Sequence, residues 1–274
     1  MNHTSAELKQ MARANLSNKW NAVLGLTAMQ TLIVFALTQC TTLFQSTTWL
    51  GTTVYIIVNL IINLLTTLLS VGASFFYLKI CRGRDYKLTD MFAVFKMNPD
   101  RFLIVALIQN LLILLVQLPL YIQPISTIIS ISDSIHIIIL SVVCSIAGSL
   151  VSTIFSMFFG ISYYLMLDFP ELEAIASMRL SATLMRGNKW RYFYIFALSF
   201  LGWEFLGGMT FGLGYLWITP YVTMTRTYFY CDVLEQLRET EHDFEIPVPE
   251  QDSAETDYES PADTEPESPA DTAL

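Results

Sequence analysis

Charged residues are scarce along most of this 274-residue chain. They make up 14% of the sequence, whereas hydrophobic residues make up 53%. No Asp, Glu, Lys or Arg lies between Lys19 and Lys79, and Asp133 is the one such residue between Arg101 and Asp168. A typical soluble domain contains about 25% charged residues. The scarcity therefore excludes an ordinary soluble globule and indicates an integral membrane protein.

Cysteine and histidine are too sparse and too scattered to predict a metal site. The four cysteines lack the spacing of metal ligands, and they are better interpreted as small apolar residues. The sequence contains no GxSxG, HExxH, Walker or dinucleotide-binding motif. We therefore expect no cofactor, no bound metal and no enzyme activity, and we expect no nucleic-acid partner.

The Lys and Arg residues gather in four clusters, at residues 9–19, 79–101, 179–191 and 226–238. Because cytoplasmic loops collect Lys and Arg, all four clusters should lie on one side of the membrane. A helix needs about 20 apolar residues to cross, and each stretch between clusters can hold two such helices. We therefore predict an all-α, polytopic bundle of six transmembrane helices, arranged as three hairpins. We expect both termini to lie in the cytoplasm.

The expected helices cover about residues 20–44, 52–80, 102–121, 136–167, 190–206 and 210–231, which together with the N-terminal segment make residues 1–231 the membrane domain. We expect Gly207 and Gly208 to join the last two helices. The fourth helix is longer than a membrane requires, so it should tilt, kink near Gly148 or Gly160, or protrude into the cytoplasm.

A short amphipathic segment precedes each hairpin on its cytoplasmic side, at about residues 5–16, 88–95 and 170–186. For the third segment, Asp168 is a candidate N-cap and Pro170 suits the first turn, while Gly187 can end the helix. Arg186 and Lys189 are spaced to reach lipid headgroups. We therefore expect this helix to lie on the inner leaflet.

Polar side chains recur at helical spacing inside the second and third expected helices: Asn59, Asn63, Gln109, Asn110 and Gln117. Polar groups in lipid must face protein or water. We interpret this set as contacts between helices. The alternative is that it lines a hydrophilic path through a transporter.

The composition changes abruptly at Asp232. Residues 232–274 contain fifteen Asp or Glu residues and one base, Arg238, whereas residues 1–231 carry a net charge of +5. Such a segment cannot bury enough apolar surface to fold by itself, so we predict a disordered, acidic, cytoplasmic tail. The tail either binds a basic protein partner or is merely solvated.

The C-terminal half also resembles a known family. The residues that carry the resemblance are Leu167-Asp168-Phe169-Pro170, the run from Leu184 to Arg191 that includes Trp190, the run from Leu198 to Trp203, Gly212-Leu213-Gly214 and Pro220-Tyr221. This series is similar to the bacterial integral-membrane family called domain of unknown function, number nine-seven-five. The resemblance implies a six-pass protein over about residues 1–234, without an assigned activity.

Several of these positions have a structural interpretation. Lys189 and Trp190 would anchor the fifth helix at the inner interface. Pro220, followed by Tyr221, would open the backbone of the last helix. Glu204, next to Trp203, is an acid inside a predicted span, and we expect it at the hydrated outer interface.

From the sequence we expect a non-enzymatic membrane scaffold or accessory subunit, in contact with the lipid bilayer. One alternative is a small-solute transporter or efflux component. A second is a lipid-modifying enzyme at the inner leaflet, which would place Asp168, Arg186 and Lys189 near the lipid headgroups.

Overall fold

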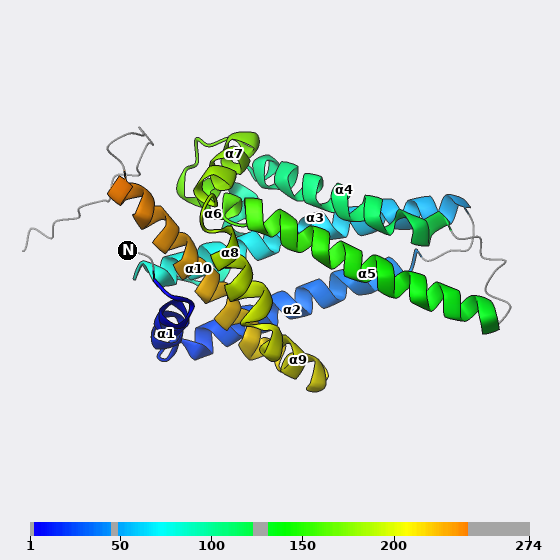
Figure 1. Cartoon of the computed structure of the whole chain (residues 1–274), viewed down its shortest axis with the longest axis horizontal. Helices are drawn as coiled ribbons and strands as arrows, with labels where there is room; N and C mark the ends of the chain where they lie inside the picture. The colour runs from blue at the N-terminus through cyan, green and yellow to red at the C-terminus, as the bar shows by residue number, and fades with distance from the viewer. Residues whose placement is uncertain (1–2, 45–48, 123–130, 241–274) are drawn as a thin grey trace, which may run out of the picture. The chain divides into compact units, whose positions relative to one another are not determined.

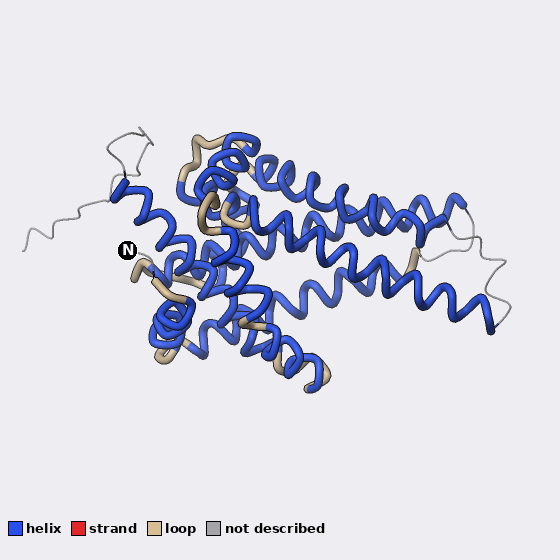
Figure 2. The backbone as a smooth tube through the Cα atoms, viewed as in Figure 1, coloured by secondary structure: helices blue, strands red, loops and turns tan. Residues whose placement is uncertain are grey.

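The computed structural model describes residues 3–44, 49–122 and 131–240, all within the unit Met1–Phe244. The elements found in these ranges are helices joined by short turns, without a strand (Figure 2). The described helices therefore agree with the all-α prediction. Residues 241–274, which include most of the predicted acidic tail, lie outside the described residues.

Long, nearly uncharged helices dominate the first two thirds of the chain (Figure 1): α2 (Trp20–Thr42), α3 (Trp49–Cys81), α4 (Pro99–Ile122) and α5 (Ile131–Phe159). An α-helix satisfies its own backbone polar groups, as a lipid environment requires. Five helical segments are long and apolar enough to cross a membrane: one from each of these helices, and Lys189–Met209. Only 17–22% of the residues in these segments are buried inside the protein. Most of their apolar surface is therefore left to face lipid or another protein.

The sixth expected span, about residues 210–231, corresponds to α10 (Tyr215–Thr240), which begins later than expected and is not among the five apolar segments found in the described residues. This helix also runs past residue 231, where we expected it to end. Val233 and Leu234 are buried, so the packed face of α10 continues into the segment that composition alone assigned to the tail. Pro220 lies inside the helix, as expected.

The fourth expected span is divided in two. The helix α5 ends at Phe159, and α6 (Ser162–Asp168) begins after a turn at Gly160. A Cβ atom at Gly160 would lie 3.0 Å from the Tyr192 hydroxyl and 2.4 Å from the Ser156 carbonyl oxygen. A residue without a side chain is thus needed where the chain bends, whereas the helix passes through Gly148 without a break.

The helix that begins near Lys189 has three parts: α8 (Lys189–Phe193), a short π-helix η3 (Tyr194–Leu198) and α9 (Leu201–Met209). The predicted turn at Gly207 and Gly208 is wrong, because both residues lie within α9. A Cβ at Gly207 would lie 3.0 Å from the Tyr215 ring, so this glycine permits close packing of α9 on α10. The turn comes later, where Phe211 and Gly212 have φ angles of 53° and 87°.

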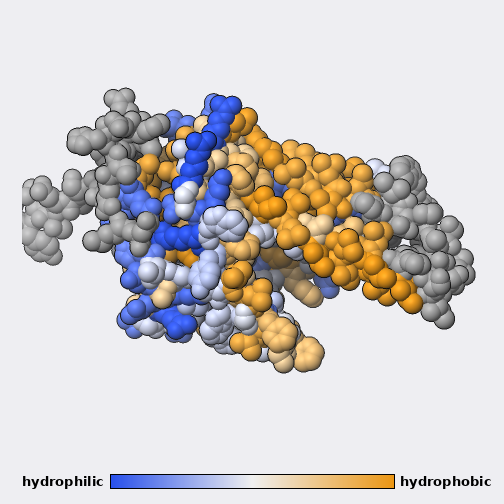
Figure 3. Space-filling model, viewed as in Figure 1, coloured by the Kyte–Doolittle hydropathy of each residue, from blue (hydrophilic) through white to orange (hydrophobic). Residues whose placement is uncertain are grey.

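The shorter elements gather at one end of the unit, which we call the polar end: α1 (Ser5–Leu16), the 3-10 helix η1 (Leu88–Lys96), α6, α7 (Ala174–Leu184) and the C-terminal half of α10. Hydrophilic residues gather over α1 and α10 on the face shown in Figure 3, whereas hydrophobic residues cover α4 and α5. The amphipathic segments predicted before each hairpin thus correspond to α1, η1 and α7.

The packed core lies largely at the polar end. Its largest fully buried side chains include Phe76 of α3, Phe102 of α4, Tyr164 of α6 and the neighbours Phe229 and Tyr230 of α10. Tyr164 and Tyr230 stack with ring centroids 5.1 Å apart. Burying an aromatic side chain of this size stabilises a fold by about 1.5–3 kcal/mol. The polar end is therefore the part of the unit that packs most like a soluble protein.

The helix α7 begins later than expected, with Glu173 at its N-cap position. The prediction that Asp168 caps it and that Pro170 occupies its first turn is wrong. Arg101 of α4, which is 8% exposed, donates hydrogen bonds to the carbonyl oxygens of Pro170 and, at 3.3 Å, Leu172. These bonds hold the segment before α7 in a non-helical conformation.

Candidate functional site

Asp168, at the end of α6, links three helices of the polar end. Its side chain is 3% exposed. The guanidinium of Arg82 donates to both carboxylate oxygens, over 2.6 and 2.5 Å, and the Tyr230 hydroxyl donates over 2.5 Å. Burial by itself would lower the pKa of Arg82, but hydrogen bonding and charge pairing with Asp168 raise that pKa above its usual value. The carboxylate is thus committed to holding α3 and α10 against α6.

A second buried carboxylate, Asp232 of α10, contacts residues from the first and last parts of the described chain. Its side chain is also 3% exposed. His3 Nδ1 lies 2.6 Å from one carboxylate oxygen, and Arg191 of α8 donates to the other over 2.6 Å. Arg191 also donates to the His3 carbonyl oxygen over 2.5 Å. This cluster fixes the start of the chain against α8 and α10, although residue 3 and residue 232 are far apart in sequence.

The expected surface positions near α7 are spread out. Arg186 is exposed, and Gly187 has a φ of 90°, a conformation that favours glycine. Lys189 lies 3.7 Å from the centroid of the Phe158 ring, and Trp190 is 77% exposed. Asp168 contacts Arg82 and Tyr230 rather than Arg186 or Lys189, according to the contacts of the described residues. Asp168 and Lys189 therefore have different partners among the described residues.

The expected positions of the last hairpin pack by their aromatic rings. Tyr221 is buried against Phe200 and Trp203, with ring centroids 5.3 and 6.3 Å away, and the Arg13 guanidinium lies 5.1 Å from the Tyr221 ring. Glu204 is exposed, and its backbone carbonyl accepts a hydrogen bond from Tyr215. The expected outer-interface position of Glu204 refers to a membrane, so it stays a prediction.

Four of the five polar positions predicted in the second and third spans line one cavity. It has a volume of about 250 Å³, lies between α3 and α4, and is lined by the amides of Asn59, Asn63, Asn110 and Gln117 together with apolar residues. Asn63 donates to the Asn59 side chain over 2.7 Å, and Asn110 donates to its own helix. Gln109 is not among the lining residues of this cavity.

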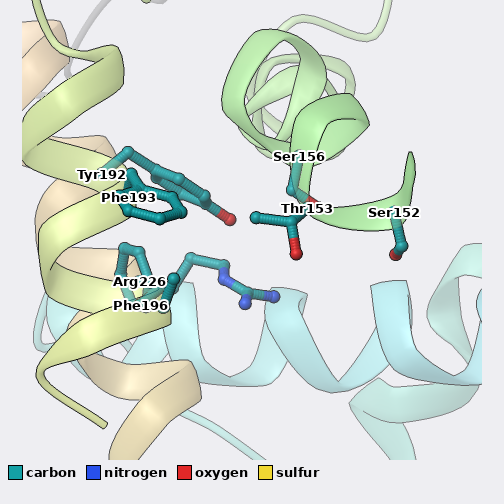
Figure 4. Close-up of a pocket in the computed structure, with 8 residues that line it drawn as sticks. Ser152, Thr153, Ser156, Tyr192, Phe193, Phe196 and Arg226 are labelled. Carbon is teal, nitrogen blue, oxygen red and sulfur yellow. The ribbon is translucent and has the colours of Figure 1, made fainter. Parts of the chain in front are cut away.

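A second cavity was not expected from the sequence. It has a volume of about 140 Å³ and lies between α5, the α8 and η3 helices, and Arg226 of α10. In Figure 4 the Arg226 guanidinium and the Tyr192 hydroxyl point toward the hydroxyl groups of α5. The Nε atom of Arg226 is buried without a hydrogen-bond partner, and the guanidinium lies 5.2 Å from the Phe196 ring centroid. In the sequence, Arg226 was grouped with the basic residues of the inner interface. Its position inside the expected span of residues 210–231 was the signal that could have indicated a functional site.

Together, the helices and the buried ion pairs show to which class of protein the chain belongs. The chain is a helical protein with several membrane-length helices and a polar end that buried ion pairs hold together. The family described as "Protein of unknown function (DUF975)" matches residues 1–237, and the chain belongs to that family. This finding confirms the family resemblance of the sequence. Comparison with curated proteins and with solved structures gave no match.

Proposed function

We propose that this chain is a six-pass protein of the bacterial inner membrane that acts as a non-enzymatic scaffold or accessory subunit. The observation that carries the proposal is the use of the two carboxylates buried at the polar end. Asp168 and Asp232 are each 3% exposed, and each binds donors from two other segments of the chain. Carboxylates engaged in this way fix the shape of a surface, and they are poorly suited to exchange protons with a substrate.

The contact between His3 and Asp232 supports the proposed topology. It brings the start of α1 and the C-terminal half of α10 to the same end of the unit. Arg82, which follows α3, reaches that end through its pair with Asp168. An even number of crossings returns a chain to the side where it began, so α10 serves in this proposal as the sixth crossing. The basic clusters then lie in the cytoplasm, as the positive-inside rule requires.

The polar end offers a fixed surface, and the acidic tail follows α10 in the sequence. In η1, Leu88, Phe92 and Phe95 are 41%, 40% and 39% exposed, while Met91 and Val94 are buried against the unit. The residues after 240 add a dense negative charge. A protein with a basic surface is the partner whose charge complements that tail.

The tail provides the test of this role. Because α10 is helical to Thr240, a truncation should remove residues 245–274 and leave the helix intact. We expect the full chain, purified from membranes in mild detergent, to retain a partner that the truncated chain loses. The control is a tail of equal length with each Asp and Glu changed to Asn and Gln, which should also lose the partner. Identical partners for all three proteins, or no partner for the full chain, would contradict the scaffold proposal.

The cavity between α3 and α4 favours a transporter as the second candidate function. Its amide lining offers hydrogen bonds to a small polar solute at the level of the membrane-length helices. The discriminating variants are Asn63→Leu and Asn110→Leu, with Asn15→Leu as a control outside the cavity. A transporter should lose solute movement in the first two variants and keep its partners. A scaffold should show no such loss.

A lipid-modifying enzyme is the third candidate, and the geometry supports it least because Asp168 is fully engaged. We expect a strain that lacks the protein to keep its phospholipid composition. A specific change in one phospholipid class, restored by the wild-type gene and not by an Asp168→Asn variant, would favour the enzyme instead.

A further inference from the structure

Arg226 brings a positive charge into the unit without a described negative partner. The ion pairs of the described residues engage Asp90, Asp168 and Asp232 with other bases. An arginine cannot lose its proton in a protein, so the partial burial of Arg226 does not remove this charge. Burying an unpaired charge is costly, and a cavity beside it is the natural place for a counter-ion.

The cavity presents hydrogen-bond donors from several directions. The Arg226 guanidinium approaches from α10, the Tyr192 hydroxyl from α8, and the hydroxyls of Ser152 and Ser156 from α5 (Figure 4). Thr153 also lines the cavity, but it donates to the Ser149 carbonyl oxygen over 2.8 Å. Donors spread in this way suit an acceptor with more than two oxygens, and an arginine fork matches phosphate in particular.

The helices that form the cavity are irregular at this level. Ser199 donates to the Tyr194 carbonyl oxygen over 2.9 Å, five residues back, as in a π-helix. Such π-segments are often found at functional sites. Gly160 ends the neighbouring helix, and its lack of a side chain admits the Tyr192 ring. The local sequence thus opens space where regular helices would close it.

The depth of the cavity also fits a membrane phosphate. Ser152 and Ser156 lie about 5 to 10 Å along the helix from the end of α5 at Phe159, at 1.5 Å per residue. That end of α5 joins the polar end, and Lys189 lies beside it over Phe158. In the proposed topology the cavity therefore lies close to the cytoplasmic end of this span, on the side of the cytoplasmic leaflet. The cavity has a volume of about 140 Å³, well above the 10–15 Å³ that one water needs, so it can hold a group larger than a single water.

We infer that this cavity is a binding site for a phosphate group that carries one negative charge, held by Arg226 and the hydroxyls of Tyr192, Ser152 and Ser156. The group belongs either to an inner-leaflet phospholipid or to free phosphate. A singly charged phosphodiester neutralises Arg226 one to one. The site does not depend on the scaffold role, because its argument uses none of the tail or partner observations.

The test uses the full chain, purified and stripped of lipid in a neutral detergent, with two probes. Inorganic phosphate is compared with sodium chloride of equal ionic strength by thermal unfolding. Dioleoyl phosphatidylglycerol is titrated and counted on the protein by native mass spectrometry. The wild-type protein should respond to at least one probe, and a response to the lipid alone would assign the site to a phospholipid.

Arg226→Gln removes the charge and should lower the affinity for the responding probe about 100-fold. Tyr192→Phe removes one donor and should lower that affinity about tenfold. Arg84→Gln is the control, since it makes the same charge change at an exposed loop position. Equal binding by the wild-type and Arg226→Gln proteins, or no response to either probe, would overturn the inference. If Arg226→Gln does not fold, unchanged affinity in Tyr192→Phe would overturn it as well.

Discussion

Replacing Asp168 with Asn should destabilise the polar end. The substitution keeps the size of the side chain but removes the charge that holds two hydrogen bonds from Arg82 and one from Tyr230. Breaking a buried ion pair by removing one partner costs about 3–5 kcal/mol. The Arg82 side chain is 29% exposed and can recover some hydration, so we expect a loss of about 2–3 kcal/mol.

Thermal unfolding of the purified protein, followed by tryptophan fluorescence in detergent, measures this loss. For a domain of this size, 1 kcal/mol corresponds to roughly 2–4 °C in Tm, so Asp168→Asn should lower Tm by roughly 5–10 °C. The control is Asp90→Asn, because Asp90 pairs with Lys79 over 3.0 Å at a more exposed site. That change should cost less than about 1 kcal/mol.

A double-mutant cycle isolates the pair itself. Asp168→Asn combined with Arg82→Gln should be much less destabilised than the sum of the two single variants, because either change alone already breaks the same interaction. Additive effects, or an Asp168→Asn variant as stable as the wild type, would refute the assignment of Asp168 as the link between α3, α6 and α10.

Two further predictions concern helix packing. The Sγ atoms of Cys81 and Cys231 lie 3.7 Å apart, so oxidation with copper phenanthroline should join these residues in a disulfide and protect both from alkylation. Full alkylation of both residues after oxidation would show that α3 and α10 do not meet there. A Cβ at Gly72 would lie 1.8 Å from the Met91 carbonyl oxygen, so Gly72→Leu should displace η1 and abolish the monodisperse peak in size-exclusion chromatography. Gly25→Leu is the control in a roomier position, and equal behaviour of the two variants would contradict this packing.

Features that depend on local composition could be predicted from the sequence. The long uncharged stretches gave the positions of α2, α3 and α4 to within a few residues, because burial in lipid acts on each helix separately. The amphipathic periodicity indicated α1, η1 and α7, because the periodicity is a property of each segment by itself. The excess length of the fourth expected helix predicted an irregularity, but it did not decide between Gly148 and Gly160; the break comes at Gly160.

Features that depend on pairs distant in sequence could not be predicted. Asp168 has the residue type and position of an N-cap, yet its partners Arg82 and Tyr230 lie 86 and 62 residues away. The hydrogen bonds from Arg101 to the Pro170 and Leu172 carbonyls likewise override a local helix signal. Local propensity is a weak guide where tertiary contacts satisfy the same backbone groups.

The cavity at Arg226 shows a different limit. The sequence shows a lone base in the last expected span, but the three hydroxyl residues of α5 that face it lie some 70 residues earlier in the chain. Serine residues in a membrane helix also support close packing between helices, so these hydroxyls do not by themselves indicate a binding site. Only the arrangement of α5, α8 and α10 brings the charge and the hydroxyls to one place.

Labelling of Arg84→Cys, in a protein whose four native cysteines are changed to serine, tests most directly the claim that the polar end faces the cytoplasm. Arg84 is exposed in the loop between α3 and η1, next to the Arg82 and Asp168 pair. A membrane-impermeant maleimide should label this cysteine in permeabilised cells and leave it unlabelled in intact cells. Equal labelling in intact cells would place the polar end outside and contradict the account.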